Sequence, residues 1–276
     1  RANTEKRSKF IRLLGWLIRG DSDLCALMTE ATPTTNNANS NTPNSNLTAT
    51  TTTLEIILRT AISSSDQEER NSSLFFIECY LIKSKVTPDF LAKTICQKIG
   101  IESSNMLLNF ESKPNEVSSL LLIACDCLLA NHDTLFIFFN ESLPGVEKTF
   151  LGEVIEGILH NETSFQPNVL IYALRFVSAA IWESPTATTY LLNTLMTTQC
   201  EKYQNGLIFV LSLCQSGSIE NVKKITSLLI LETLLFKDKE KPVFDELVRT
   251  LQLGQVKVHD LSTSINEYSK ELADGE

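Results

Sequence analysis

Residues 119–135 read SLLLIACDCLLANHDTL, and this stretch decides the fold. It combines a long apolar helix, a short polar turn and a second helix that opens on an apolar residue. Because the first helix is apolar nearly all round, neighbouring helices must cover it on both sides. The same order of features recurs in KFIRLLGWLIRGDSDL at 9–24, SLFFIECYLIKSKVTPDF at 73–90 and VLIYALRFVSAAIWESPTATTYL at 169–191. The sequence therefore predicts stacked helical repeats.

The spacing of these repeats indicates their class. The anchor residues Leu17, Leu81, Leu128 and Ile181 lie 64, 47 and 53 residues apart. Removing a low-complexity tract of about 20 residues shortens the first interval to about 45, within the period of HEAT and armadillo units. Further helical segments lie between the pairs, at 54–62, 104–110 and 147–160, so we count three helices per unit. We predict an all-α fold, a right-handed superhelical stack of armadillo/HEAT-like repeats.

Composition excludes several other classes. The chain has 276 residues, 43% of them hydrophobic, with only 10 Gly and 8 Pro, which is too few for an all-β fold rich in tight turns. Its net charge is −9, so it lacks the positive field that a nucleic-acid-binding protein needs. The densest basic stretch, Lys6, Arg7, Lys9 and Arg12, is typical of a solvated helix face.

Cysteine usage and hydropathy bear on the compartment. The seven cysteines are odd in number and include no C-x-x-C motif, which favours buried free thiols in a reducing compartment. There is no signal-peptide pattern. No apolar run reaches the roughly 18 residues of a membrane span, and Asp126 interrupts the richest run. We expect a piece of a larger cytoplasmic protein.

Domain limits follow from composition. The tract at 32–53, TPTTNNANSNTPNSNLTATTTT, has almost nothing to bury, so we expect a disordered insertion. It would interrupt one helical-repeat domain at 1–256, and the polar, acidic segment at 257–276 would form a C-terminal helix or tail.

Several local signals predict helix ends. Gly20 should end one helix, and Asp21 or Ser22 should cap the next. Thr87, as a cap before Pro88, should begin a helix that Gly100 stops. Pro167 and Pro185 should lie at first turns, the second after the cap Ser184. Further starts are predicted near Ser218 and at Pro242.

Apolar periodicity predicts which helix faces are buried. We expect four buried stripes, made of Phe10, Leu13, Leu14, Leu17 and Ile18; of Leu74, Ile77, Leu81 and Ile82; of Val154, Ile155, Ile158 and Leu159; and of Leu170, Leu174, Val177 and Ile181.

No constellation of residues predicts catalysis, a cofactor or a metal. His132 and His160 fit a turn and a helix end, and the chain contains no phosphate-loop, nucleophile-elbow or zinc-protease motif. Cys125 and Cys127 could supply only two of the four ligands of a zinc site. The charged runs at 66–69 and 237–241 are expected to be solvated turns. No catalytic, cofactor-binding or metal residue is predicted, and the residues that bind a partner are unknown.

Three stretches carry a family resemblance. They are FIRLLGWLIRGDSDLCALM followed by LEIILRTAISSSDQEERNSSLFFIECYLIKSKVTPDFLA, then VLIYALRFVSAAIWESPTATTYLL, and finally YQNGLIFVLSLC from Tyr203. Together they resemble the armadillo-like head of the general vesicular transport factor family of ER-to-Golgi tethers. The resemblance implies binding to small GTPases, fusion proteins or Golgi matrix proteins, and is compatible with peripheral association with Golgi or transport-vesicle membranes and with a homodimer. The tract at 32–53 departs from this family.

Three functional hypotheses remain. The first is a non-catalytic protein-interaction scaffold, in vesicle tethering if the resemblance holds. The second is a regulatory or nuclear-transport adaptor of armadillo/HEAT fold, which would bind a basic targeting peptide in a salt-sensitive manner. The third is an enzyme with a helical fold, which requires a deep pocket with converging ionisable groups.

Overall fold

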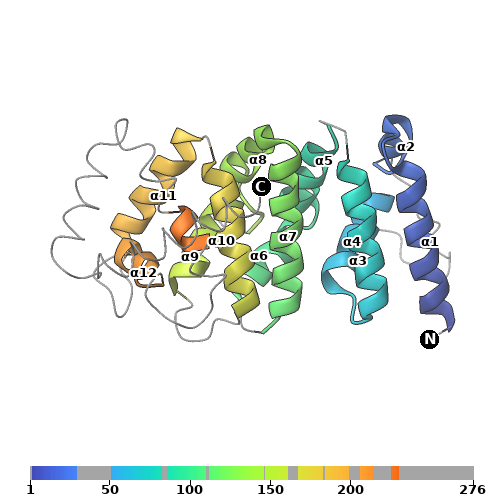
Figure 1. Ribbon diagram of the computed structural model, residues 1–276, viewed down its shortest axis with the longest axis horizontal. Coiled ribbons are helices and arrows are strands. Elements are labelled where there is room, and N and C mark those ends of the chain that lie inside the picture. Colours follow the sequence, from blue (N-terminus) through green and yellow to red (C-terminus); the bar gives the residue numbers. More distant parts are fainter. Residues whose placement is uncertain are drawn as a thin grey trace, which may run out of the picture.

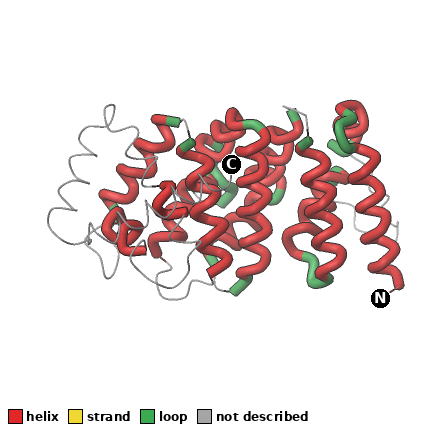
Figure 2. Tube along the Cα trace, viewed as in Figure 1, coloured by secondary structure: helices red, strands yellow, loops and turns green. Residues whose placement is uncertain are grey.

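The computed structural model describes residues 2–29, 51–82, 86–109, 112–145, 147–160, 167–182, 184–198, 206–213 and 225–229. Within these ranges the chain is helical with short connections and has no β-strand, which confirms the all-α prediction (Figure 1, Figure 2). The labelled helices are α1 (Ala2–Ile18), α2 (Ser22–Leu27), α3 (Thr53–Ser63), α4 (Gln67–Leu81), α5 (Thr87–Lys93), the π-helix η1 (Thr94–Lys98), α6 (Gly100–Leu108), α7 (Pro114–Ala130), the 3-10 helix η2 (His132–Thr134), α8 (Leu135–Asn140), α9 (Phe150–His160), α10 (Pro167–Ile181), α11 (Pro185–Thr197) and α12 (Gly206–Leu213).

Long helices form a row in sequence order. Helix α1 packs on α4, α4 packs on α7, and α7 packs on α10 (Figure 1). Two further α-helices separate each member of the row from the next, so the described helices divide into four three-helix units, α1–α3, α4–α6, α7–α9 and α10–α12. Helices α4, α7 and α10 begin 47 and 53 residues apart, as the predicted anchors do.

The shorter helices also pack against their counterparts in the next unit. An ion pair between Arg59 and Glu102 joins α3 to α6, and α6 packs on α9. Helix α5 packs on α8, which contacts α11 through the rings of Phe139 and Tyr190, 5.2 Å apart. Successive units therefore pack against each other through more than one pair of corresponding helices.

The core contains large side chains from every unit. A cluster of aromatic rings joins the third unit to the fourth: Phe138 lies 5.0 Å from Phe150 and 5.4 Å from Phe176, measured between ring centroids. All three rings are fully buried. Edge-to-face rings at such distances stabilise a core beyond the area that they bury.

Most predicted helix ends are confirmed. Gly20 takes a left-handed conformation (φ 80°) after α1, and the Asp21 carboxylate accepts hydrogen bonds from the Asp23 and Leu24 amides at the start of α2. Ser184 caps α11 by accepting from the Ala187 amide, and Pro167 begins α10.

Two predicted ends are wrong. Thr87 is the first residue of α5 and not its cap. Gly100 does not stop that helix, because η1 carries the chain on to Lys98 and Gly100 begins α6. Glycine is needed there for close approach, since a Cβ would collide with the ring of Pro144.

The buried stripes are confirmed on α9 and α10 and largely on α4, but the stripe on α1 is wrong at three of its five positions. Phe10, Leu13 and Leu17 are more than half exposed, and the face that packs on α4 carries Ile11 and Ile18. The helix is apolar on two sides, and periodicity alone cannot tell which side meets a neighbour. Of the four residues whose spacing indicated the repeat, Leu17 is exposed, while Leu81, Leu128 and Ile181 are buried.

Residues 32–50 of the predicted insertion lie outside the described residues, but its predicted end is wrong. Thr53 begins α3, and the Thr52 hydroxyl caps that helix by accepting a hydrogen bond from the Glu55 amide. Threonine in a low-complexity tract predicts disorder, but a threonine at a helix start can cap the helix and so become ordered. The predictions at 237–241, 257–276, Ser218 and Pro242 also lie outside the described residues, and so do the side chains of Cys200, Cys214 and His259.

No helix within the described ranges has the length and apolar character that a membrane crossing requires.

Candidate protein-binding surface

Two residues of the basic stretch on α1 contact α4, although the whole stretch was expected to be solvated. Arg7 Nε lies 3.2 Å from Glu69 Oε1, and Arg12 Nε donates to Ser72 Oγ at 3.0 Å, so both side chains tie α1 to α4. The prediction of a solvated turn at 66–69 is wrong, because Asp66 caps α4 and residues 67–69 form its first turn, where Glu69 is only 7% exposed. Its carboxylate tolerates burial because Arg7 supplies charge and Ser64 Oγ donates at 2.9 Å.

The cysteines in the described part of the chain are buried and form no disulfide. Cys25, Cys79, Cys96, Cys125 and Cys127 are buried free thiols. Burial raises the pKa of Cys125 to about 11, with a further contribution from the charge of Asp126, and it raises the pKa of Cys127 as well. Thiols of this kind are poor nucleophiles. No group of three or more His, Cys, Asp or Glu side chains within the described ranges could hold a metal ion.

Asp126 is an acidic side chain of α7 that is partly buried. Burial raises its pKa to about 6, and the nearby charge of Glu78 raises it further, while Arg175 acts in the opposite direction. Glu78 lies in α4 and Arg175 in α10, so both neighbouring helices influence the charge of Asp126. This arrangement offers a pH response.

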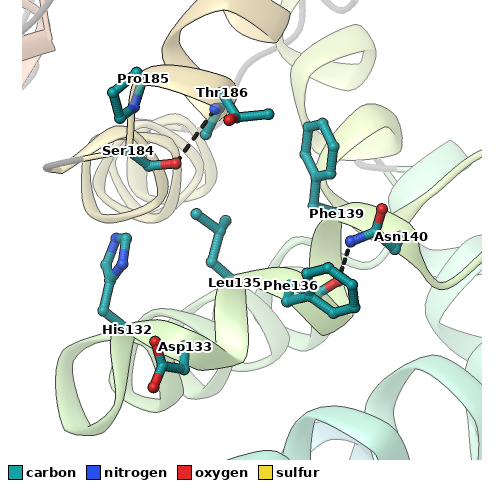
Figure 3. Close-up of a pocket in the computed structure, with 10 residues that line it drawn as sticks. His132, Asp133, Leu135, Phe136, Phe139, Asn140, Ser184, Pro185 and Thr186 are labelled. Atoms are coloured by element: carbon teal, nitrogen blue, oxygen red, sulfur yellow. Dashed lines mark hydrogen bonds between the residues drawn. The ribbon is translucent and has the colours of Figure 1, made fainter.

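An apolar groove separates α8 from the first turn of α11 (Figure 3). Its volume is about 430 Å³. His132 and Leu135 project from η2 and α8 toward the start of α11, where Ser184 and Pro185 lie. Phe136 and Phe139 add aromatic walls. We call this the α8–α11 groove.

The position of His132 is fixed by contacts to two units. Asn131 caps η2 by accepting from the Asp133 amide, and Asp89 of α5 accepts from Thr134 Oγ1 at 2.9 Å. The His132 ring places Nε2 3.2 Å from the carbonyl oxygen of Ala179 in α10. The turn between α7 and α8 is therefore tied to both the preceding and the following unit.

A second groove, of about 700 Å³, lies between α7, α10 and residues 225–229. We call it the α7–α10 groove. Leu128, Leu129, Ala179 and Trp182 give it an apolar lining, and Arg175 contributes a cation. His132 lines this groove too, so the two grooves meet at that residue, at the junction between the third and fourth units.

Exposed apolar side chains gather at these two grooves. Leu129 is 68% exposed, Phe136 73% and Trp182 52%, and each lines one of the grooves. The junction between α4 and α7 differs, because its smaller hollow is lined mainly by polar side chains such as Gln67, Arg70 and Asn115. The concentration of apolar surface at His132 is therefore not a general property of the junctions.

Sequence reasoning did not find this surface. The sequence predicts a turn at His132, which the structure places in the short 3-10 helix η2, and His160 is the last residue of α9, but neither pattern indicates that Phe136 or Leu129 is exposed. Trp182, at the end of a helix before a Ser-Pro turn, was the one available signal. Comparisons with protein-family models, curated proteins and solved structures found no significant match.

Proposed function

We propose that this protein is a non-catalytic scaffold that binds other proteins, with its units wound as a right-handed armadillo/HEAT-like superhelix. The row α1, α4, α7, α10 and the regular interposition of two helices support this winding. Stacked three-helix units create long surfaces at their junctions, which suit extended or helical partners.

One observation carries the proposal. Leu129, Phe136 and Trp182 are exposed apolar side chains that surround two grooves meeting at His132. Soluble proteins seldom gather such side chains around hollows except where they bind something. Buried aromatic anchors also supply much of the energy of protein interfaces.

The walls of the grooves indicate the form of the partner. They are helices, which do not present the row of unpaired amides and carbonyls along a sheet edge that an added strand needs. Recognition must therefore use side chains. We propose that an amphipathic helix of the partner places apolar side chains in both grooves, in the helix-in-groove mode.

The resemblance to vesicular transport factors supports a more specific proposal. On that basis the partner is a membrane-traffic component, and the chain acts as the head of a tether. A partner that proves to be a basic targeting peptide, released by salt, would instead support the adaptor function.

Site-specific photo-crosslinking tests the proposal. A photoreactive side chain is placed at Phe136 or at Trp182, and the labelled protein is irradiated in cell extract. The matched control places it at Ile101 of α6, which is 60% exposed and lines neither groove. We expect one defined protein to crosslink at 136 and 182 and not at 101, through an amphipathic helical segment that mass spectrometry locates.

The recovered protein is then purified and titrated. Phe136→Ala should weaken its binding about 30-fold, the effect of losing roughly 2 kcal/mol at an aromatic anchor, while Ile101→Ala leaves binding unchanged. Crosslinks of equal yield at all three positions, or equal affinities, would overturn the proposal.

A further inference from the structure

Helix α1 has a second apolar face that no described helix covers. Its inner face carries Ile11 and Ile18, which are buried against α4. On the other side Phe10, Leu13 and Leu17 are 59%, 55% and 56% exposed, and Trp16, which is 57% exposed, lies at the edge of this face, where its ring is 5.4 Å from the ring of Phe75 in α4. We call these four side chains the outer face of α1. They recur at helical spacing, so they form one continuous strip.

The outer face lies at one end of the molecule. Among the described helices, α1 packs on α4 and α2 and has no neighbour on its other side (Figure 1). A strip in this position can meet a flat surface without interference from the rest of the described fold.

Charge around this face is opposite to that of the chain as a whole. Residues 1–20 contain six basic side chains and one acidic one, whereas the remaining residues contain 18 basic and 32 acidic side chains. Lys9 pairs with Glu5, and Arg7 pairs with Glu69. Lys6, Arg12 and Arg19 have no carboxylate partner within the described residues, and Arg19 lies over the ring of Trp16 at 5.3 Å.

We propose that the outer face of α1 docks on a membrane surface that contains anionic phospholipids. Helices with Lys and Arg beside Trp, Phe and Leu bind in the plane of the lipid–water interface, where the apolar side chains insert and the cations contact phosphate. The acidic remainder of the chain is repelled by the same surface, which orients α1 toward it. A second copy of the chain is a poorer occupant, because it would bring the same cations against one another. The inference does not depend on the groove at His132.

Vesicle sedimentation with the whole chain tests the inference. The probes are vesicles of phosphatidylcholine alone and of phosphatidylcholine with about a third phosphatidylserine, in about 0.15 M salt. We expect binding to the anionic vesicles only, with release in about 0.5 M salt, where screening is stronger. In a Trp182→Phe background, the fluorescence of Trp16 should shift to the blue when the anionic vesicles are added.

Variants locate the contact. Lys6→Gln should weaken vesicle binding about fivefold, because one basic residue near an anionic surface contributes about 1 kcal/mol of binding free energy. Leu13→Ser combined with Leu17→Ser should weaken it at least about tenfold. The matched control is Ile101→Ser with Leu108→Ser, which removes two similarly exposed side chains from α6 and should leave binding unchanged.

Three outcomes would overturn the inference. The first is no binding to anionic vesicles. The second is equal binding to the two kinds of vesicle, or equal loss in the control variant. The third is a dimer in solution that Leu13→Ser with Leu17→Ser abolishes, which would assign the face to a second copy of the chain.

Discussion

Two phenylalanines of α8 lie two residues apart and have opposite surroundings. Phe138 is fully buried and packs between the rings of Phe150 and Phe176, whereas Phe136 is 73% exposed at the α8–α11 groove. Residues two apart on a helix point in nearly opposite directions. The junction between the third and fourth units is therefore sealed on its inner side and open on its outer side. Two side chains of the same type on one helix can therefore differ in role, since one stabilises the core and the other forms part of an exposed surface. The amino-acid type alone does not predict which role each has.

The largest effect should come from a charge placed on the sealed side. Leu128 is 2% exposed at the centre of the row, so Leu128→Asp should destabilise the fold by about 5 kcal/mol or more and abolish cooperative unfolding. The neighbouring Leu129 is 68% exposed, and Leu129→Asp should leave the melting temperature nearly unchanged. Thermal denaturation followed by circular dichroism compares the two, and similar losses would end the distinction between the sides.

The two phenylalanines themselves give the next effect. Phe138→Ala should lower the free energy of unfolding by about 3–5 kcal/mol, because it leaves a cavity among three rings. Phe136→Ala should change it by less than about 0.5 kcal/mol. Urea denaturation of both variants measures the difference, and a large loss in Phe136→Ala would show that the outer side is also part of the core.

Asp126 should show a pH-dependent effect between these extremes. Its pKa of about 6 in the folded protein is above that of an ordinary carboxyl, so the folded state holds the proton more tightly. Its contribution therefore favours folding at low pH and is lost as pH rises from about 4 to about 6. Asp126→Asn should raise stability by about 1–2 kcal/mol at pH 7.5, after allowance for partial solvation, and by less at pH 4.5. Thermal melts at the two pH values would contradict this if the advantage were the same.

The smallest effect on stability is expected from a deletion in the tract at 32–50, which lies between α2 and α3 in the sequence. The Leu54 amide donates to the carbonyl of Met28 at 3.1 Å, so the chain on either side of the 32–50 tract is already joined. Deletion of residues 33–50 should change the melting temperature by no more than about 2 °C, because loop length has a weak effect on stability. Differential scanning calorimetry tests this, and a drop of many degrees would show that the tract belongs to the core.

Much of the fold could be predicted from the sequence. The apolar helices around Leu81, Leu128 and Ile181, their spacing and the caps at Asp21 and Ser184 follow from periodicity and capping chemistry. Such signals are local or repeat regularly, so they can be recognised in the sequence without knowledge of tertiary contacts.

The surfaces could not be predicted, because exposure depends on which neighbour each helix face meets. Leu17 and Ile18 are equally apolar, yet only Ile18 meets α4. Glu69 resembles any solvated acid until Arg7, far away in sequence, is placed beside it. The exposure of Phe136 could not be predicted for the same reason, because the groove beside it is formed with α11, about 50 residues later in the chain.

In the proposed scaffold, Phe136 is left exposed for a partner and does not stabilise the fold. The most direct measurement is the dissociation constant of Phe136→Ser for the crosslinked partner, determined on protein whose melting temperature matches the parent chain. We predict binding weakened at least about 30-fold with unchanged unfolding. An unchanged dissociation constant, in protein that melts normally, would contradict the claim.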